Sequence, residues 1–339
     1  MNKDYLLQFA KSILAIDSPS GFTKNIITYL ENECRHMNLI YEKNNKGNLI
    51  ITIPGQNNYT IGLSAHVDTL GAMVRSVKSD GTLAFTLIGG PLLPTYDGEY
   101  CRIYTRDNKI FQGTFLSDAP SIHVFEDAKS MTRDSSHMHI RLDEMTKNKK
   151  DTQELGIAPG DFIAVDPKTT ITENGFIKSR FLDDKISVAI LFGLIEHIHT
   201  NNLKPKNTLK IIISTYEEVG HGGSHIPSVD EMLAVDMGCI GLDLTCTEYD
   251  VSICAKDSSG PYDYDMTSKL IKLAKDNHLQ FAVDIYPMYG SDVSAALRAG
   301  NNIKGALIGP GVHASHGMER THIQGVENTL KLLFAYCGV

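Results

Sequence analysis

Apolar side chains recur at helical spacing near the start of the chain. Their period predicts two amphipathic helices, over about residues 5–14 and 26–37, because residues three and four apart share one face of a helix. The segment Ser18-Pro19-Ser20-Gly21 separates the two patterns. Short runs typical of β-strands then follow at residues 39–42, 49–53 and 60–64, the last ending just before His66.

The pattern changes between about residues 70 and 168. Short β-type runs continue there, divided by glycines, prolines and polar stretches, and no long amphipathic helix is evident. About 100 residues is a normal size for a domain. We therefore expect a β-rich domain over 70–168, inserted into a larger domain made of 1–69 and 169–339. We expect the polar stretch 147–151 to be an exposed loop.

Helical and strand patterns alternate after residue 168. The predicted order is helix 186–197, strand 209–214, apolar run 232–235, helix 266–277, strand 280–285, helix 293–298, strand 303–308 and a final helix from about 323. Such alternation predicts an α/β fold with a mainly parallel sheet covered by helices on both faces. In these sheets, functional sites collect at the carboxyl ends of the strands.

Polar residues with catalytic potential follow several of these strands. The set consists of two histidines and several carboxylates without any cysteine, and its members are His66, Asp68, Asp183, Asp184, Glu217, Glu218, Asp236 and His316. Mixed imidazole and carboxylate ligands suit zinc, cobalt or manganese, whereas calcium prefers oxygen alone and structural zinc sites are rich in thiolate.

The adjacent Glu217 and Glu218 can serve one site only beyond the end of a strand, since neighbouring side chains on a regular strand point to opposite faces. Gly220, Gly222 and Gly223 follow them and allow a sharp bend. One carboxylate could then bind metal while the other accepts a proton from an attacking water.

Each motif also has an ordinary structural interpretation. Asp183 and Asp184 could simply cap a helix, a Glu-Glu pair often lies on a solvated face, and His66-Val67-Asp68 is a weak motif by itself. The joint placement of these residues at strand ends favours a functional site.

Five segments together resemble the glutamyl and deblocking aminopeptidase family of co-catalytic metallopeptidases, which includes the tetrahedral aminopeptidases. They are Ser64-Ala65-His66-Val67-Asp68, Arg180-Phe181-Leu182-Asp183-Asp184-Lys185, Tyr216-Glu217-Glu218-Val219-Gly220, Val235-Asp236-Met237-Gly238 and Ala314-Ser315-His316-Gly317-Met318-Glu319-Arg320. The resemblance spans the chain and includes Ser18-Pro19-Ser20-Gly21 and Gly290-Ser291-Asp292.

The resemblance implies a role for each candidate residue. His66 and Asp236 would bind separate metals, Asp183 would bridge them, and Glu218 and His316 would be the remaining ligands. Glu217 would be the general base, and Asp68 would orient His66. His313 is an alternative to His316, which we prefer because Gly317-Met318-Glu319 follows it.

The family's fold is a catalytic α/β domain of the dinuclear-zinc exopeptidase type, with an inserted β-barrel that mediates assembly into dimers and twelve-subunit tetrahedra. The resemblance therefore implies two divalent metal ions per chain and a homo-oligomer. Zinc is the default metal, with cobalt or manganese as alternatives. It also implies a cis peptide bond between Asp183 and Asp184.

The composition narrows the possible partners. A formal charge of −8 from 32 basic and 40 acidic residues gives no electrostatic footprint for nucleic acid or an anionic membrane. The start of the chain lacks a signal-peptide pattern, and no run reaches the ~20 apolar residues of a membrane span, so we expect a cytoplasmic protein. The six cysteines are scattered singly and are expected to be reduced.

The predicted function is removal of the N-terminal residue from short peptides. The alternatives are a related carboxypeptidase or amide deacylase, an endoglucanase and a non-catalytic scaffold stabilised by metal. A glycosidase needs two carboxylates facing each other across the bond, which neighbouring glutamates supply poorly. The sequence does not specify which N-terminal side chain is preferred.

Overall fold

The computed structural model describes residues 2–339, and within them the chain divides into two compact units. The larger unit runs up to Asp68 and continues from Lys168 to Val339, and the smaller unit is Thr69–Pro167. The predicted fold class, an α/β sheet domain with an inserted β-barrel, is confirmed. None of the helices in the described part is long and apolar enough to cross a membrane.

The larger unit is built on a ten-stranded sheet with the principal order β1-β2-β12-β3-β13-β18-β15-β16, to which β14 and β17 also pair. Its strands are β1 (Ile40–Lys43), β2 (Leu49–Ile53), β3 (Asn57–His66), β12 (Asn207–Ser214), β13 (Glu231–Val235), β14 (Gly238–Cys239), β15 (Val251–Asp257), β16 (Gly260–Pro261), β17 (Phe281–Ile285) and β18 (Lys304–Val312). The four central strands β12, β3, β13 and β18 are parallel neighbours. Their carboxyl ends therefore lie along one edge of the sheet.

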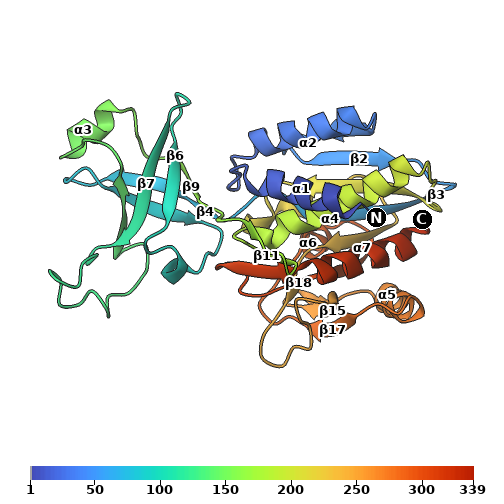
Figure 1. Cartoon of the computed structure of the whole chain (residues 1–339). Coiled ribbons are helices and arrows are strands. Elements are labelled where there is room, and N and C mark those ends of the chain that lie inside the picture. Colours follow the sequence, from blue (N-terminus) through green and yellow to red (C-terminus); the bar gives the residue numbers. More distant parts are fainter. Residues whose placement is uncertain (1) are drawn as a thin grey trace. The chain divides into compact units, whose positions relative to one another are not determined.

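Helices cover both faces of this sheet. They are α1 (Lys3–Leu14), α2 (Lys24–His36), α4 (Leu182–Thr200), α5 (Tyr264–Asp276), α6 (Asp292–Arg298) and α7 (Ile323–Cys337). On one face α4 packs between α1 and α7 (Figure 1). On the other, Val293 and Ala296 of α6 pack against Met232 and Ala234 of β13.

The central helix α4 is apolar on all sides because it is enclosed on all sides. Every residue from Leu182 to Ile195 is buried. Phe192 stacks on Phe9 of α1 with their ring centroids 4.6 Å apart. A helix surrounded in this way needs no polar face, and it gives a rigid support for the acidic residues at its start.

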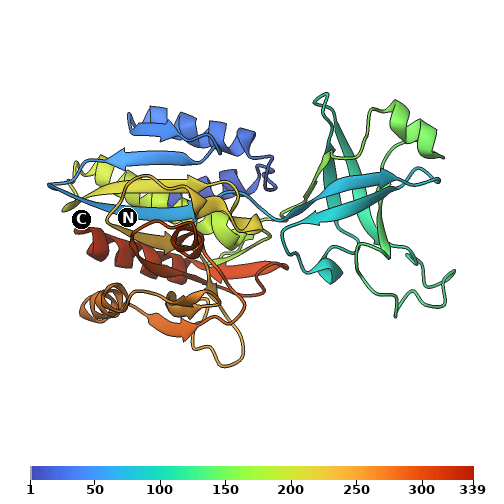
Figure 2. The same cartoon turned by 180° about the vertical axis from the view of Figure 1, so that it is seen from behind.

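The smaller unit is a closed barrel with the strand order β4-β5-β8-β7-β6-β9 (Figure 1 and Figure 2). Its strands are β4 (Gly71–Val77), β5 (Leu83–Ile88), β6 (Tyr100–Tyr104), β7 (Ile110–Ser117), β8 (Met138–Leu142) and β9 (Phe162–Val165). Phe85 and Phe115 meet edge to face inside it, with ring centroids 5.0 Å apart. Closure pairs the strand edges that an open antiparallel sheet would leave free.

Several elements of the structure differ from the sequence-based prediction. The polar stretch 147–151, expected to be a loop, enters helix α3 (Lys149–Glu154), because the Asn148 side chain accepts hydrogen bonds from the backbone N–H of Lys150 and Asp151. Strand β15 was not predicted. Ser252 of this strand is buried, and its hydroxyl group bonds to the Tyr286 hydroxyl. The sequence of the strand is therefore less apolar than that of most buried strands.

A second, three-stranded sheet lies in the larger unit, formed by β10 (Thr170–Ile171), β11 (Phe176–Ser179) and β19 (Glu319–His322). Short 3₁₀ turns also occur at Leu93–Thr95, Glu217–Val219 (η2) and Gly222–Ser224 (η3).

Candidate active site

The predicted site residues meet at the carboxyl edge of the four parallel strands. His66 is the last residue of β3, Asp236 directly follows β13, and Glu217 and Glu218 lie just beyond β12. His316 lies in the turn after β18, and Asp183 is near the start of α4. These six residues therefore lie in one region of the larger unit, as the rule for parallel sheets leads one to expect.

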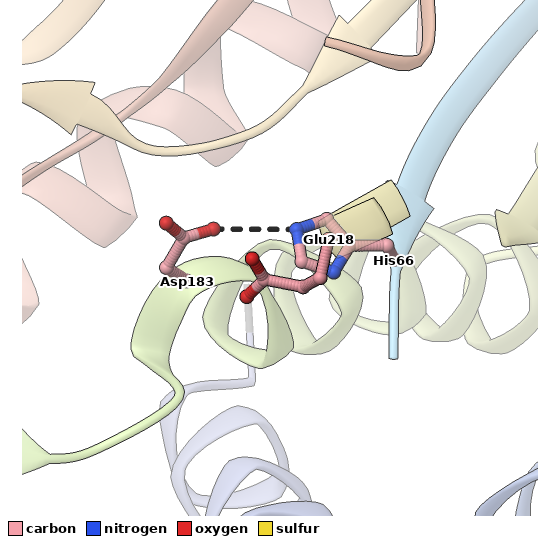
Figure 3. Close-up of side chains that lie close together, drawn as sticks. All are labelled: His66, Asp183 and Glu218. Carbon is pink, nitrogen blue, oxygen red and sulfur yellow. Dashed lines mark hydrogen bonds and ion pairs between the residues drawn. The ribbon is translucent and has the colours of Figure 1, made fainter. Parts of the chain in front are cut away.

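Asp183 lies between the two histidines. Its Oδ1 atom is 3.2 Å from Nε2 of His66, and its Oδ2 atom is 3.5 Å from Nε2 of His316. Figure 3 shows the Asp183 carboxylate directed at the His66 ring, with the Glu218 carboxylate beside them. Each oxygen of the Asp183 carboxylate therefore has one imidazole beside it.

Glu217 and Glu218 both reach this site because η2 bends the chain immediately after β12. Glu217 Oε2 lies 3.6 Å from Nε2 of His66, and Glu218 Oε2 lies 3.5 Å from Nε2 of His316. Gly220, which ends the turn, has φ +82°, a conformation that glycine adopts without steric cost.

Asp68 holds the turn that carries the two glutamates. Its Oδ1 atom accepts a hydrogen bond from the Glu217 N–H at 3.0 Å, and its Oδ2 atom accepts from the Glu218 N–H at 3.2 Å. Ser20 also donates its hydroxyl to Oδ2, at 2.5 Å. His66 Nδ1 is closer to the backbone oxygen of Asp68, at 2.9 Å, than to Oδ1 of its carboxylate, at 3.6 Å.

We expect Asp68→Asn to distort this turn. Asparagine places an NH₂ group against an N–H or the Ser20 hydroxyl, so at least one buried hydrogen bond is lost, at a cost of about 1–3 kcal/mol in the free energy of unfolding. Catalytic turnover should also fall because Glu217 is displaced. Denaturant unfolding and steady-state kinetics measure the two effects.

Ser20→Ala is the matched control, since it removes one hydrogen bond and leaves the carboxylate. Its loss of stability should be smaller, about 0.5–1.5 kcal/mol. An Asp68→Asn variant as stable and active as the parent would show that the contacts to the Glu217 and Glu218 N–H groups are dispensable.

Glu319 holds two other residues of the site, Asp183 and His316, through their backbone N–H groups. Its carboxylate accepts from the Asp183 N–H at 3.0 Å and from the His316 N–H at 3.1 Å. Burial and the nearby Asp183 carboxylate raise the pKa of Glu319 to about 8.

Burial dominates the electrostatics of the site. It raises the pKa of Glu217 and that of Glu218 well above their usual values, and it raises the pKa of Asp236 to about 7 with help from Asp183. Asp183 is the exception. Burial opposes its ionisation, but hydrogen bonds from His316 and His66 hold the pKa of Asp183 well below its usual value.

The donor set fits divalent cations. Carboxylates outnumber imidazoles, and among the described residues the Oε1 atom of Glu218 and the Oδ1 atom of Asp184 are buried without a hydrogen-bond partner. Buried anionic oxygens of this kind need a compensating charge. Two groups have potential ligand atoms within 4.8 Å of one another, namely His66 with Asp183 and Glu218, and His66 with Asp184 and Asp236.

This grouping bears on one expectation. The resemblance implies that His66 and Asp236 bind separate metals, and their potential ligand atoms lie within 4.8 Å of each other. The reason is that β3 and β13 are adjacent parallel strands, so their carboxyl ends meet. One ion could therefore contact both residues.

His316 and His313, the two histidines that the sequence leaves as alternatives, differ in position. His316 lines the cavity at the site and lies near Asp183 and Glu218. His313 is exposed, and its backbone pairs with Arg320. The peptide bond between Asp183 and Asp184 is cis, as the resemblance implies.

A cavity of about 460 Å³ opens onto these residues. Its lining includes Glu217 and four of the five ligand candidates, all except His66, together with Met237, Cys239, Met288, Tyr289, Asp292, Ala295 and Arg298. The sequence assigned no role to Tyr289, Asp292, Ser20 or Glu319, and it gave Asp184 only as a candidate without a specific role. Tyr289 had no sequence signal, whereas the other four lie within the motif segments already described.

Comparison with known proteins agrees with this fold. A sequence model of the M42 glutamyl aminopeptidase family matches residues 47–332. YhfE of Bacillus subtilis (strain 168) is 47% identical over 333 residues, which cover 97% of this chain and 96% of that protein. The glutamyl aminopeptidase of Lactococcus lactis subsp. cremoris (strain MG1363) is 26% identical over 238 residues, covering 68% of this chain and 66% of the relative.

The fold is also that of a solved peptidase. The TET1 peptidase of Pyrococcus horikoshii superimposes with a TM-score of 0.84 at 21% identity, covering 98% of this chain and 99% of the other. These features define a peptidase, an enzyme that hydrolyses peptide bonds. The chain belongs to the M42 glutamyl aminopeptidase family.

Proposed function

We propose that this enzyme removes the N-terminal residue of short peptides, using two divalent metal ions and Glu217 as the general base. The observation that carries the proposal is Asp183, which presents one carboxylate oxygen to His66 and the other to His316. His66, Asp183, Glu218, Asp236 and His316 would hold the metals. When bound, the ions would polarise the scissile carbonyl and lower the pKa of the attacking water.

Glu217 is placed to move the proton. It lines the cavity and lies 3.6 Å from His66, and the Asp68 carboxylate fixes its backbone. The Glu217 carboxylate would take a proton from the attacking water and then pass it to the nitrogen of the leaving amine. This role needs a carboxylate that faces the cavity, and Glu217 meets that requirement.

The charge of the cavity favours an aminopeptidase over a carboxypeptidase. Several carboxylates line it, and among the described residues Arg298 is its one lysine or arginine. Two bound divalent ions would neutralise most of this negative charge, and the lining would still offer a terminal carboxylate a single basic partner. A carboxypeptidase or a deacylase acting on carboxylate-bearing substrates is therefore the weaker alternative.

Zinc is the metal we propose, because imidazole and carboxylate ligands suit it, with cobalt or manganese as activators. We also propose that the chain works in the cytoplasm as a homo-oligomer. The TET1 peptidase assembles into a tetrahedron or an octahedral shell. The smaller unit of this chain exposes apolar side chains that would suit a subunit contact, namely Leu92, Tyr100, Ile110, Ile122 and Val124.

The proposed function can be tested with a panel of chromogenic aminoacyl substrates and their N-acetylated counterparts. We expect cleavage of free-amino substrates only. The enzyme should be stripped with a chelator and then supplied with zinc, cobalt or manganese, which should restore activity. Cleavage of the acetylated substrates at an equal rate would favour the deacylase instead.

Metal binding should strengthen as the pH rises from 6 to 8. Burial and Asp183 raise the pKa of Asp236 to about 7, so at pH 6 this carboxyl is mostly protonated and a cation must displace the proton. Calorimetric titration with zinc in two buffers of different ionisation enthalpy should show proton release at pH 6 that declines by pH 8. Affinity independent of pH would contradict Asp236 as a ligand.

A further inference from the structure

The loop between β17 and α6 holds Tyr289 at the wall of the active-site cavity. Two sets of contacts fix its position. Its backbone oxygen accepts hydrogen bonds from the Ser258 N–H at 3.0 Å and from the Ser258 hydroxyl at 2.5 Å. Its ring meets Tyr286 edge to face, with centroids 5.3 Å apart. The side chain is therefore held in place by contacts that do not involve its hydroxyl group.

The hydroxyl group itself has no hydrogen bond of normal geometry. Its oxygen is buried, and the Asp236 carboxylate is the described group that acts on it. Leaving a buried polar group unpaired costs about 1–3 kcal/mol, so such a group calls for an explanation. A ligand that enters the cavity would supply the missing partner.

The other hydroxyl groups of the cavity wall are already engaged. Ser315 donates to Oδ2 of Asp183 at 3.0 Å, and Ser291 bonds to the Tyr262 hydroxyl at 2.8 Å. Among the described residues that line the cavity, Tyr289 thus carries the one hydroxyl group that remains available to a substrate. Tyrosine is protonated at neutral pH, so this hydroxyl group can act as a donor.

Peptide hydrolysis creates the need for such a donor. The oxygen of water bonds to the carbonyl carbon while Glu217 takes the proton, and the electron pair of the C=O double bond moves onto the carbonyl oxygen. When the double bond re-forms, the C–N bond breaks and the amine nitrogen receives the proton from Glu217. Donors fixed at the position of the developing oxyanion lower the barrier because they need no rearrangement.

We propose that Tyr289 is a catalytic residue whose hydroxyl donates a hydrogen bond to the carbonyl oxygen of the scissile bond as water adds to it. The inference rests on the proposed aminopeptidase function. It identifies a hydrogen-bond donor on the protein for the oxyanion that forms in that reaction. The surrounding lining is rich in carboxylates, which accept hydrogen bonds and cannot serve this purpose when ionised.

Tyr289→Phe tests the proposal because it removes only the oxygen. We expect kcat to fall by about 10²-fold, as removal of one oxyanion donor does, with KM changed by less than about threefold. Metal content and melting temperature should equal those of the parent. A phosphinate analogue of the tetrahedral intermediate should bind about 10²-fold more weakly, whereas a free product amino acid should bind equally well.

Tyr286→Phe is the matched control. It also removes a tyrosine hydroxyl from the same loop region, but that hydroxyl bonds to Ser252 in the core, and Tyr286 does not line the cavity. It should retain kcat. Unchanged kcat or unchanged phosphinate affinity in Tyr289→Phe would overturn the proposal. A loss of kcat that follows a loss of bound metal would also overturn it, because Tyr289 would then act through Asp236. Absence of aminopeptidase activity in the parent enzyme would instead refute the proposed function.

Discussion

Glu217→Gln should lower kcat by about 10²–10⁴-fold, the usual contribution of a general base, while the enzyme keeps two metal ions per chain. Glutamine has nearly the same shape but cannot accept the proton of the attacking water. The Asp68 carboxylate still holds the backbone at residue 217, so the turn should keep its conformation. Steady-state kinetics with a free-amino substrate and elemental analysis of the dialysed protein measure the two quantities.

Glu173→Gln is a suitable control because Glu173 is exposed and does not line the cavity. It should behave as the parent enzyme does. Unchanged turnover in Glu217→Gln would remove Glu217 from the mechanism and would favour a chain in which the metals have a purely structural role. Loss of metal together with activity would instead make Glu217 a ligand.

Asp183→Asn should weaken metal binding at both positions. Asparagine keeps one oxygen but replaces the other with an NH₂ group, and it has no negative charge to offset two cations. Changes around a ligand commonly cost about 10–100-fold in metal affinity, so loss of a bridging carboxylate should cost at least that much. Metal content after dialysis should fall below two ions per chain, and activity should fall with it.

The matched control is Ser315→Ala, which removes the hydrogen bond to Oδ2 of Asp183 and leaves the carboxylate intact. It should bind metal nearly as the parent does. If Asp183→Asn retained two ions at unchanged affinity, the bridging role would be wrong, and the group formed by His66, Asp184 and Asp236 would become the better candidate for a metal site.

Several contacts of the site have one physical purpose in common. The carboxylates of Asp68 and Glu319 accept backbone N–H groups of residues that face the cavity, so each fixes two functional residues at once. Side chains held in this way are preorganised and lose little entropy when substrate binds. The predicted effects of Asp68→Asn follow from this arrangement.

Local pattern was sufficient to predict most elements of the larger unit. The apolar run of β12 and the helical period of α1 are properties of short segments, and the structure has them where the sequence predicts them. Strand β15 was missed because its buried Ser252 is stabilised by Tyr286, a residue 34 positions away. Helix α3 was missed because a single cap at Asn148 outweighed a polar composition.

The sequence by itself determined the alternation of elements, the inserted β-rich segment and the chemical types of the site residues, because periodicity and motifs are local. Only the tertiary structure decided which strand ends are neighbours. Pairing of β3 with both β12 and β13 brings His66 toward Glu217 on one side and Asp236 on the other. It also decided that Asp68 holds the Glu217 turn, that Glu319 supports Asp183 and His316, and that Tyr289 lines the cavity with its hydroxyl oxygen buried. These relations depend on pairing between segments distant in the chain, which no local pattern encodes.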